Sequence, residues 1–173
     1  KDFETLAERG AKLIRDGDVV FTHCHSSTVL RVLLKARETK NFRVVCTETR
    51  PLFQGRRTAK ELVKAGVKTK MIVDSHMLSE IKECDKVFLG ADVLTSKGFL
   101  NKVGSYNAAY AAKHFRKPLY VCAHTLKYSP KLYKIEQRPA SEVWKSAPKE
   151  LEIENYSFEL VPWRFVNRVV AIY

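Results

Sequence analysis

Cys24 is the first side chain in this sequence whose position could support chemistry. An apolar run at residues 19–22 precedes it, and Ser26 and Ser27, which follow it, are residue types that cap helices. The thiol is therefore expected between the carboxyl end of a buried strand and the N-terminus of a helix, where backbone N–H groups and the helix dipole favour negative charge. Such a turn can lower the pKa of a cysteine or bind a phosphate. A small buried cysteine that only packs is the alternative interpretation.

Asp92 is the carboxyl group that could work with this thiol. It follows a second predicted buried strand, at residues 86–90, directly after the small residues Gly90 and Ala91. In a doubly wound sheet the first and fourth strands are neighbours, and a crevice opens between their carboxyl ends. A thiol and a carboxyl that face each other there could act as general base and general acid, provided that one of them is desolvated enough to keep its proton. An isolated Asp92 would more commonly cap a helix or stabilise a loop, so the pairing with Cys24 is what indicates catalysis.

Polar side chains follow the other predicted strands as well. Asn101 and Lys102 precede a helix start and could hold a phosphate or a sugar hydroxyl. Lys127 follows the fifth strand, and Gln54 opens the helix after the second strand, where it could serve an oxyanion. Asp74, after the third strand, is expected to cap the next helix. Each residue taken alone could be an ordinary loop residue, but together they predict a polar site along one edge of a sheet.

Short apolar runs alternate with amphipathic stretches along the chain. Buried strands are predicted at residues 19–22, 43–47, 69–73, 86–90 and 119–123. Helices are predicted at about 27–38, 55–65, 75–83 and 105–115, after a lead-in helix at 3–15. This alternation predicts an α/β fold with a doubly wound, mostly parallel sheet and helices on both faces. The proline-containing segment 127–150 is expected to run irregularly over one edge of the sheet, before one or two further strands at 158–161 and 168–172.

The composition fits one domain over residues 1–173, because a chain of this length with 45% hydrophobic residues can bury a full core. The longest apolar runs are too short to cross a bilayer, and the charged start lacks the apolar segment of a signal peptide. We therefore predict a cytoplasmic protein with no membrane partner.

The net charge of +12, from 31 Lys and Arg against 19 Asp and Glu, predicts an anionic partner. The basic residues are scattered and no RNA-binding aromatic motif accompanies them, so nucleic acid is a weaker interpretation than a phosphorylated metabolite. The 4 cysteines form no CxxC pair or zinc spacing, which predicts reduced thiols and no metal site. There is no GxGxxG or Walker loop, and no cofactor is expected.

Five motifs, taken in order, carry a resemblance to a known family. They are THCHSS at residues 22–27, TETRPLFQG at 47–55, IVDS at 72–75, GAD at 90–92 and NKVG at 101–104. This combination resembles the superfamily of translation initiation factor 2B regulatory subunits, which also contains methylthioribose-1-phosphate isomerase and the archaeal ribose-1,5-bisphosphate isomerase. The resemblance runs from about residue 18 to residue 172.

The resemblance implies a sugar-phosphate aldose–ketose isomerase. The isomerases of the superfamily use the cysteine of the THC motif and the aspartate of the GAD motif, which match Cys24 and Asp92, whereas the initiation factor subunits have often replaced this pair. The serines after the thiol and the stretch at residues 124–128 look most like the ribose-1,5-bisphosphate enzyme, in which Asn101, Lys102 and Lys127 would contact substrate. By the same resemblance, the product would be ribulose-1,5-bisphosphate, formed in the breakdown of nucleotides such as AMP.

Three departures from the family pattern bear on this expectation. His25 stands where the isomerases usually have asparagine, and the segment between Asp92 and Asn101 is about one residue shorter. The helical N-terminal domain of the family, which contributes phosphate-binding arginines, is expected to be absent, which leaves the activity of the isolated domain open.

A non-catalytic regulatory subunit is the alternative function. Such a subunit would bind a nucleotide or a sugar phosphate and dock onto translation initiation factor 2 or partner subunits. The resemblance implies a homo-oligomer or a complex in either case. A third interpretation, an RNA-binding basic domain, predicts a steep salt dependence of RNA affinity.

Overall fold

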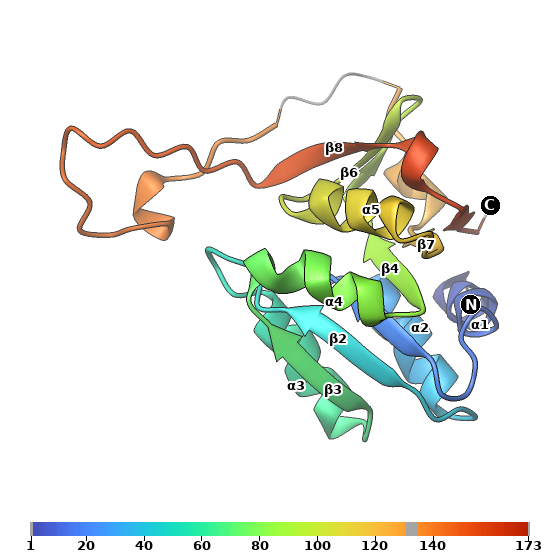
Figure 1. The fold of residues 1–173 in the computed structure, drawn as a ribbon. Coiled ribbons are helices and arrows are strands. Elements are labelled where there is room, and N and C mark those ends of the chain that lie inside the picture. Colours follow the sequence, from blue (N-terminus) through green and yellow to red (C-terminus); the bar gives the residue numbers. More distant parts are fainter. Residues whose placement is uncertain (1, 131–134, 173) are drawn as a thin grey trace.

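The computed structural model describes residues 2–130 and 135–172. Its centre is a six-stranded sheet in which every pair of neighbouring strands is parallel (Figure 1). The strands, in their order across the sheet, are β3 (Lys68–Ile72), β2 (Arg43–Thr47), β1 (Val19–Thr22), β4 (Lys86–Gly90), β7 (Leu119–Cys122) and β9 (Arg168–Val170). The first and fourth strands of the chain are therefore neighbours, and the predicted doubly wound α/β fold is confirmed.

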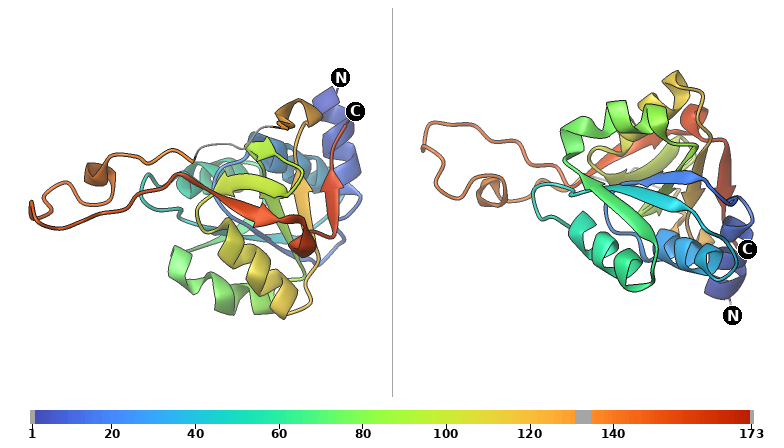
Figure 2. Two further views of the ribbon diagram at one scale, coloured as in Figure 1. Left: turned by 90° about the horizontal axis from the view of Figure 1, so that it is seen from above. Right: turned by 60° about the horizontal axis from the view of Figure 1, so that its bottom comes forward.

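Helices cover both faces of this sheet (Figure 2). One face packs against α1 (Asp2–Ala11), α2 (Ser27–Arg37) and α3 (Gly55–Lys64), and the other against α4 (Met77–Glu83) and α5 (Ser105–His114). Val20 and Phe21 belong to different cores because successive side chains of a strand point to opposite faces. No helix in the part of the chain that the structure describes is long and apolar enough to cross a bilayer.

A second, antiparallel sheet was not predicted. It contains β5 (Val93–Leu94), β6 (Gly98–Lys102) and β8 (Phe158–Pro162), in the order β5-β6-β8. The Thr95 hydroxyl closes the turn between the first two strands by accepting from Gly98 N at 3.2 Å. Residues 92–101 show no strand period in the sequence because turn-type residues divide them into short runs. The predicted strand at residues 158–161 forms, but it lies in this small sheet, whereas β9 joins the main sheet.

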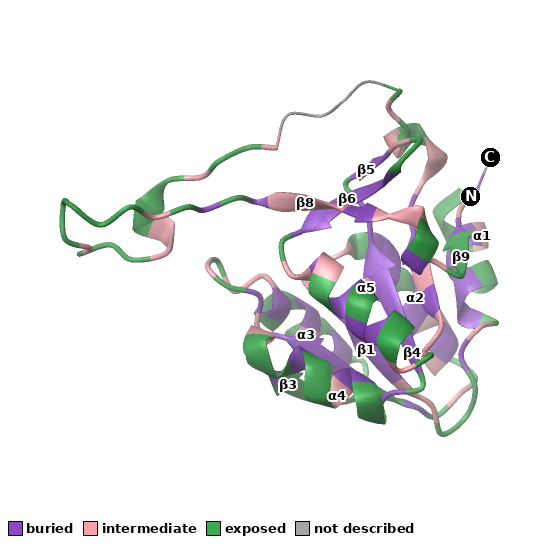
Figure 3. Ribbon diagram, turned by 45° about the horizontal axis from the view of Figure 1, so that its top comes forward, coloured by how far each residue is buried: buried purple, intermediate pink, exposed green. Residues whose placement is uncertain are grey.

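Residues 135–157 form a segment that we call the arm. It extends away from the two sheets in Figure 1, and much of it is exposed in Figure 3. Its large exposed hydrophobic side chains are Trp144, Leu151 and Tyr156. The irregular course predicted for residues 127–150 is confirmed where the structure describes it, apart from the 3-10 turns η2 (Thr125–Lys127) and η3 (Ala140–Glu142); residues 131–134 of that prediction lie outside the described residues. The arm projects from the domain instead of covering an edge of the main sheet.

The amino ends of the central strands are held by a buried ion pair. Lys86, at the start of β4, is 7% exposed, and its Nζ lies 2.6 Å from Asp18 Oδ2 and donates to the carbonyl of Leu13 at 2.8 Å. Beside it, the backbone N–H of Val19 donates to Asp85 Oδ2 at 2.7 Å. Buried polar groups at this end of the sheet are thus satisfied within the fold.

Candidate active site

A cavity of about 300 Å³ opens at the carboxyl ends of β1 and β4. Five of the predicted site residues line it together: Cys24, Gln54, Asp92, Asn101 and Lys102. The remaining described residues of its lining are His25, Leu52, Glu136, Arg138, Glu142, Ser157 and Phe158. The fold therefore brings strand ends that are far apart in sequence to one hollow, as the doubly wound topology requires.

Cys24 has an unusual backbone conformation. Its φ of 67° lies in the left-handed region, which a residue with a Cβ rarely adopts. Its N–H donates to Thr49 Oγ1 at 3.1 Å, and its carbonyl accepts from Thr58 Oγ1 at 3.1 Å. Both backbone groups of Cys24 are thus held by threonine hydroxyls from the neighbouring β2–α3 region.

The helix start after Cys24, which could lower the pKa of its thiol, does not do so in this structure. Burial raises the pKa of this thiol to about 11, although the backbone N–H of His25 and the charge of Lys102 act in the opposite direction. Ser26 does cap α2, since its Oγ accepts from Val29 N at 3.3 Å, but the stabilisation that this turn offers an anion is smaller than the penalty of burying a thiolate. Cys24 is therefore protonated at neutral pH.

Asp92 reaches the same cavity because β4 ends in small residues. A Cβ at Gly90 would lie 2.4 Å from Ser26 Oγ, so only glycine lets this strand end pass the helix cap. Asp92 keeps exposed surface, yet desolvation by the surrounding protein raises its pKa, while Lys127 acts to lower it. The carboxyl group is thus more easily protonated than an ordinary aspartate.

Asn101 and Lys102 end strand β6 rather than lying in a loop. Both are buried, at 5% and 6% exposed, and Asn101 Nδ2 donates to Ser105 Oγ at 2.8 Å. Lys102 Nζ has no hydrogen-bond or ion-pair partner among the residues that the structure describes. The charge of Lys102 helps to lower the pKa of Glu142, which lines the same cavity, but its ammonium group makes no hydrogen bond to the described residues and can still bind an anionic ligand.

Gln54 also has an unused polar atom. It immediately precedes α3 but makes no side-chain cap, and its buried Oε1 has no hydrogen-bond donor among the described residues. Leaving such an acceptor unpaired is unfavourable, so a ligand hydroxyl that donates to it would be stabilising.

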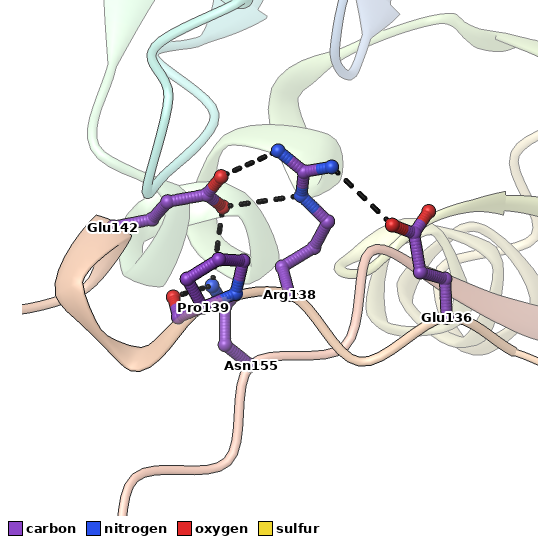
Figure 4. Close-up of polar contacts among 5 residues, drawn as sticks. All are labelled: Glu136, Arg138, Pro139, Glu142 and Asn155. Atoms are coloured by element: carbon purple, nitrogen blue, oxygen red, sulfur yellow. Dashed lines mark hydrogen bonds and ion pairs between the residues drawn. The ribbon is translucent and has the colours of Figure 1, made fainter.

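Sequence reasoning missed the side of the cavity that the arm contributes. Arg138 lies between two carboxylates there, with Nη2 2.5 Å from Glu142 Oε1 and Nη1 3.3 Å from Glu136 Oε1 (Figure 4). Asn155 Nδ2 adds donations to Glu142 Oε2 at 3.3 Å and to the carbonyl of Pro139 at 3.0 Å. The i,i+4 spacing of Arg138 and Glu142 signals a local pair, but nothing in the sequence places that pair opposite Cys24.

Three predicted substrate contacts do not line the cavity. The Ser26 side chain is used as a helix cap, Ser27 is exposed, and Lys127 Nζ donates to the carbonyl of Ala91 at 2.6 Å. The charge of Lys127 does act on Asp92, whose pKa it lowers. The substrate-binding roles of Ser26, Ser27 and Lys127 stay predictions.

Asp74 does not cap the next helix as predicted. It opens the 3-10 turn η1 (Asp74–His76), and its carboxylate accepts from the backbone N–H groups of Thr49 and Arg50 at 2.9 and 2.6 Å. This carboxylate therefore fixes the loop after β2.

Residues 2–130 and 135–172 contain no cluster of three or more His, Cys, Asp or Glu side chains that could hold a metal ion.

The fold and the cavity define a doubly wound α/β domain with a thiol and a carboxyl at the carboxyl ends of adjacent strands. More particularly, the chain belongs to the initiation factor 2 subunit family, which it matches over residues 2–171. The family resemblance seen in the motifs is thereby confirmed.

Relatives of both functional kinds are similar to the chain. It is 41% identical over 178 residues to the ribose 1,5-bisphosphate isomerase of Archaeoglobus fulgidus, covering 96% of this chain and 56% of the relative. It is 39% identical to the enzyme of the same name from Thermococcus kodakarensis, over 99% of this chain and 57% of the relative. The crystal structure of translation initiation factor eIF-2B from Pyrococcus horikoshii OT3 superimposes with a TM-score of 0.89 at 34% identity, covering 98% of this chain and 62% of that one. The chain thus spans somewhat more than half the length of these relatives.

Proposed function

We propose that this chain carries the active site of an aldose–ketose isomerase that converts ribose-1,5-bisphosphate into ribulose-1,5-bisphosphate. The observation that carries the proposal is that the Cys24 thiol, the Asp92 carboxyl and the Lys102 side chain line one cavity. The identity of 41% and 39% to ribose 1,5-bisphosphate isomerases supports the choice of substrate. The proposed setting is nucleotide breakdown, such as that of AMP, in the cytoplasm, without a cofactor.

The proposed chemistry follows from the phosphate at C1 of the sugar. This phosphate prevents opening to a free aldehyde, so the ring oxygen must receive a proton as the ring opens, and Asp92 in its protonated form is the proposed acid. The bond between the ring oxygen and C1 breaks as this proton arrives, and the Cys24 thiolate takes the proton from C2, which leaves an enediol-type intermediate. Addition of a proton at C1 and loss of the C2 hydroxyl proton then give the ketose. Lys102, Lys127 and the start of α2 are proposed to hold the phosphates, and Gln54 and Asn101 the sugar hydroxyls.

The pKa directions add a constraint to this mechanism. With the Cys24 pKa at about 11, the state with a thiolate and a protonated Asp92 is the minor one at neutral pH. The proposed reaction runs through that state, whose fraction stays constant between the two pKa values. Activity is therefore expected to be flat through neutral pH and to fall in acid, where both groups are protonated.

Substitution of the two reacting groups tests the proposal. Cys24→Ser and Asp92→Asn are each expected to reduce turnover of ribose-1,5-bisphosphate by at least about 10³-fold with circular dichroism unchanged. Cys84→Ser is the matched control, because it removes a thiol at the other end of the sheet. The assay uses the intact protein, with any further residues that it has beyond this sequence. Near-normal formation of ribulose-1,5-bisphosphate in either site variant would contradict the assigned roles.

A non-catalytic regulatory subunit is the second candidate, and the similarity to the Pyrococcus horikoshii translation initiation factor eIF-2B favours it. This function predicts no turnover by the intact protein, together with capture of translation initiation factor 2 in a pull-down. For either function we propose a homo-oligomer, with the exposed Trp144, Leu151 and Tyr156 of the arm as part of its contact surface.

A further inference from the structure

A chain of buried and partly buried hydrogen bonds leads from Val103, directly after strand β6, to the backbone of Cys24. His23 Nε2 contacts the carbonyl of Val103 at 2.8 Å, and His23 Nδ1 contacts Thr47 Oγ1 at 2.6 Å. Thr47 Oγ1 lies 3.0 Å from Thr49 Oγ1, which accepts from the Cys24 N–H at 3.1 Å. His23, Thr47 and Thr49 are at most 1% exposed. Water therefore cannot easily replace the contacts among these three side chains.

The chemistry of the groups fixes the direction of this chain. The carbonyl of Val103 can only accept, so His23 Nε2 carries the hydrogen; burial lowers the pKa of His23, and Nδ1 of the neutral ring is then an acceptor. The hydroxyl of Thr47 donates to that nitrogen, and the hydroxyl of Thr49 donates to Thr47. The remaining lone pairs of Thr49 Oγ1 are thus left to accept from the Cys24 N–H.

Thr49 is itself held in an unusual conformation. Its φ is 64°, in the same left-handed region as that of Cys24. The Asp74 carboxylate accepts from the N–H groups of Thr49 and Arg50, at 2.9 and 2.6 Å, and so fixes the turn that presents the Thr49 hydroxyl. Residues with a Cβ remain in this region only where the surrounding structure holds them there, and such positions gather at functional sites.

We propose that Thr49 and Asp74 are positioning residues for Cys24, which hold its backbone in the left-handed conformation and thereby keep its thiol in the cavity opposite Asp92. The proposal deepens the isomerase function and depends on it for the kinetic effects, whereas the conformational claim stands independently of any substrate. Neither residue lines the cavity, so both act through Cys24.

Thr49→Val is the direct test, because it removes the hydroxyl while keeping the shape of the side chain. The Cys24 N–H then loses its acceptor, and the backbone is expected to relax and turn the thiol toward solvent. We expect kcat to fall on the order of 100-fold with KM little changed, since small displacements of reacting groups have effects of this size. Alkylation of Cys24 by iodoacetamide, followed by peptide mass spectrometry at pH 8, is expected to become severalfold faster, while Cys46, Cys84 and Cys122 stay protected.

Three further variants distinguish positioning from general damage. Thr49→Ser retains the hydroxyl and is expected to restore most of kcat and the slow alkylation. Thr69→Val is the matched control: it removes the hydroxyl that donates to Val67 O at 2.9 Å near the start of β3, and neither readout should change. Asp74→Asn leaves one acceptor for two N–H groups, and we expect changes in the same direction as those of Thr49→Val, but smaller.

The outcomes separate this proposal from the proposed function. If Thr49→Val leaves both kcat and Cys24 alkylation as in the wild type, the positioning role is refuted although the enzyme is active. If the wild-type protein shows no isomerase activity, the proposed function fails, and the alkylation rates of the four variants still decide whether Thr49 and Asp74 hold the thiol. Simultaneous exposure of all four cysteines in Thr49→Val and Asp74→Asn would show loss of fold and would also count against a specific positioning role.

Discussion

Two lysines at opposite ends of the strands differ in how their charge is compensated. We call the side of the fold where β1 and β4 begin the amino edge, and the side with the cavity the carboxyl edge. Lys86 at the amino end and Lys102 at the carboxyl end are 7% and 6% exposed. Lys86 Nζ is 2.6 Å from Asp18 Oδ2, whereas Lys102 Nζ has no such partner within residues 2–130 and 135–172. The ion pair thus compensates the charge of Lys86 within the fold, whereas the ammonium group of Lys102 lines the cavity and stays available to an anionic ligand.

Backbone N–H and carbonyl groups at the amino edge and the side-chain amide of Gln54 at the carboxyl edge show the same contrast. At the amino edge, Asp85 accepts from the N–H of Val19, and Lys40 Nζ donates to the carbonyls of Ala11 and Ile14, each at 2.6 Å. At the carboxyl edge, Gln54 Oε1 is unpaired among the described residues. The contacts at the amino edge thus contribute to stability. At the carboxyl edge, polar groups such as Gln54 Oε1 and the ammonium group of Lys102 are left for binding and catalysis.

The largest effect is expected at the amino edge, from Lys86→Ala. This change leaves the Asp18 carboxylate without its ammonium partner, and breaking such a buried pair costs about 3 to 5 kcal/mol of unfolding free energy. Urea denaturation measures the loss, and activity per folded molecule should be unchanged because the site is at the other end of the sheet. A loss below about 1 kcal/mol would mean that the amino edge does not depend on this pair.

Lys102→Met is the matched change at the carboxyl edge, with a smaller effect of a different kind. The methionine has a similar length but no charge, so the unfolding free energy is expected not to fall. Loss of a charged hydrogen bond to phosphate, worth about 1.5 to 3 kcal/mol, should raise the KM for ribose-1,5-bisphosphate about 10- to 100-fold. Denaturation and initial-rate kinetics on the same preparation check both halves. Destabilisation as large as that of Lys86→Ala would remove the distinction between the two edges.

The position of the site could be predicted from the sequence because it depends on topology. Buried runs that alternate with helices give a doubly wound sheet, in which the residues after β1 and β4 must meet, and this brought Cys24 and Asp92 to one cavity. Asn101 and Lys102 line the same cavity, although they lie in β6, a strand that was not predicted. The turn at Thr95 divides that region into runs too short to show a strand period.

Contacts between distant segments could not be predicted. Nothing in the sequence pairs Asp18 with Lys86, or sets Arg138 and its two glutamates against the cavity. The raised pKa of Cys24 could not be predicted for the same reason. The helix start is visible in the sequence, but the packing that desolvates the thiol is not, and desolvation is the larger effect.

The smallest effect is expected for the stability of Asp92→Asn. Because the folded protein raises the pKa of Asp92 above 3.8, ionisation is less favourable in the folded than in the unfolded chain. Folding therefore loses stability as pH rises from below 3.8 through the raised pKa, and asparagine, which does not ionise, avoids that loss. The unfolding free energy of the variant minus that of the wild type should thus increase from acid to neutral pH, as measured by urea denaturation over this range. A difference independent of pH would show that the Asp92 carboxylate is as well solvated as in the unfolded chain. Asp92 would then not be one of the groups at the carboxyl edge that lower the stability of the fold.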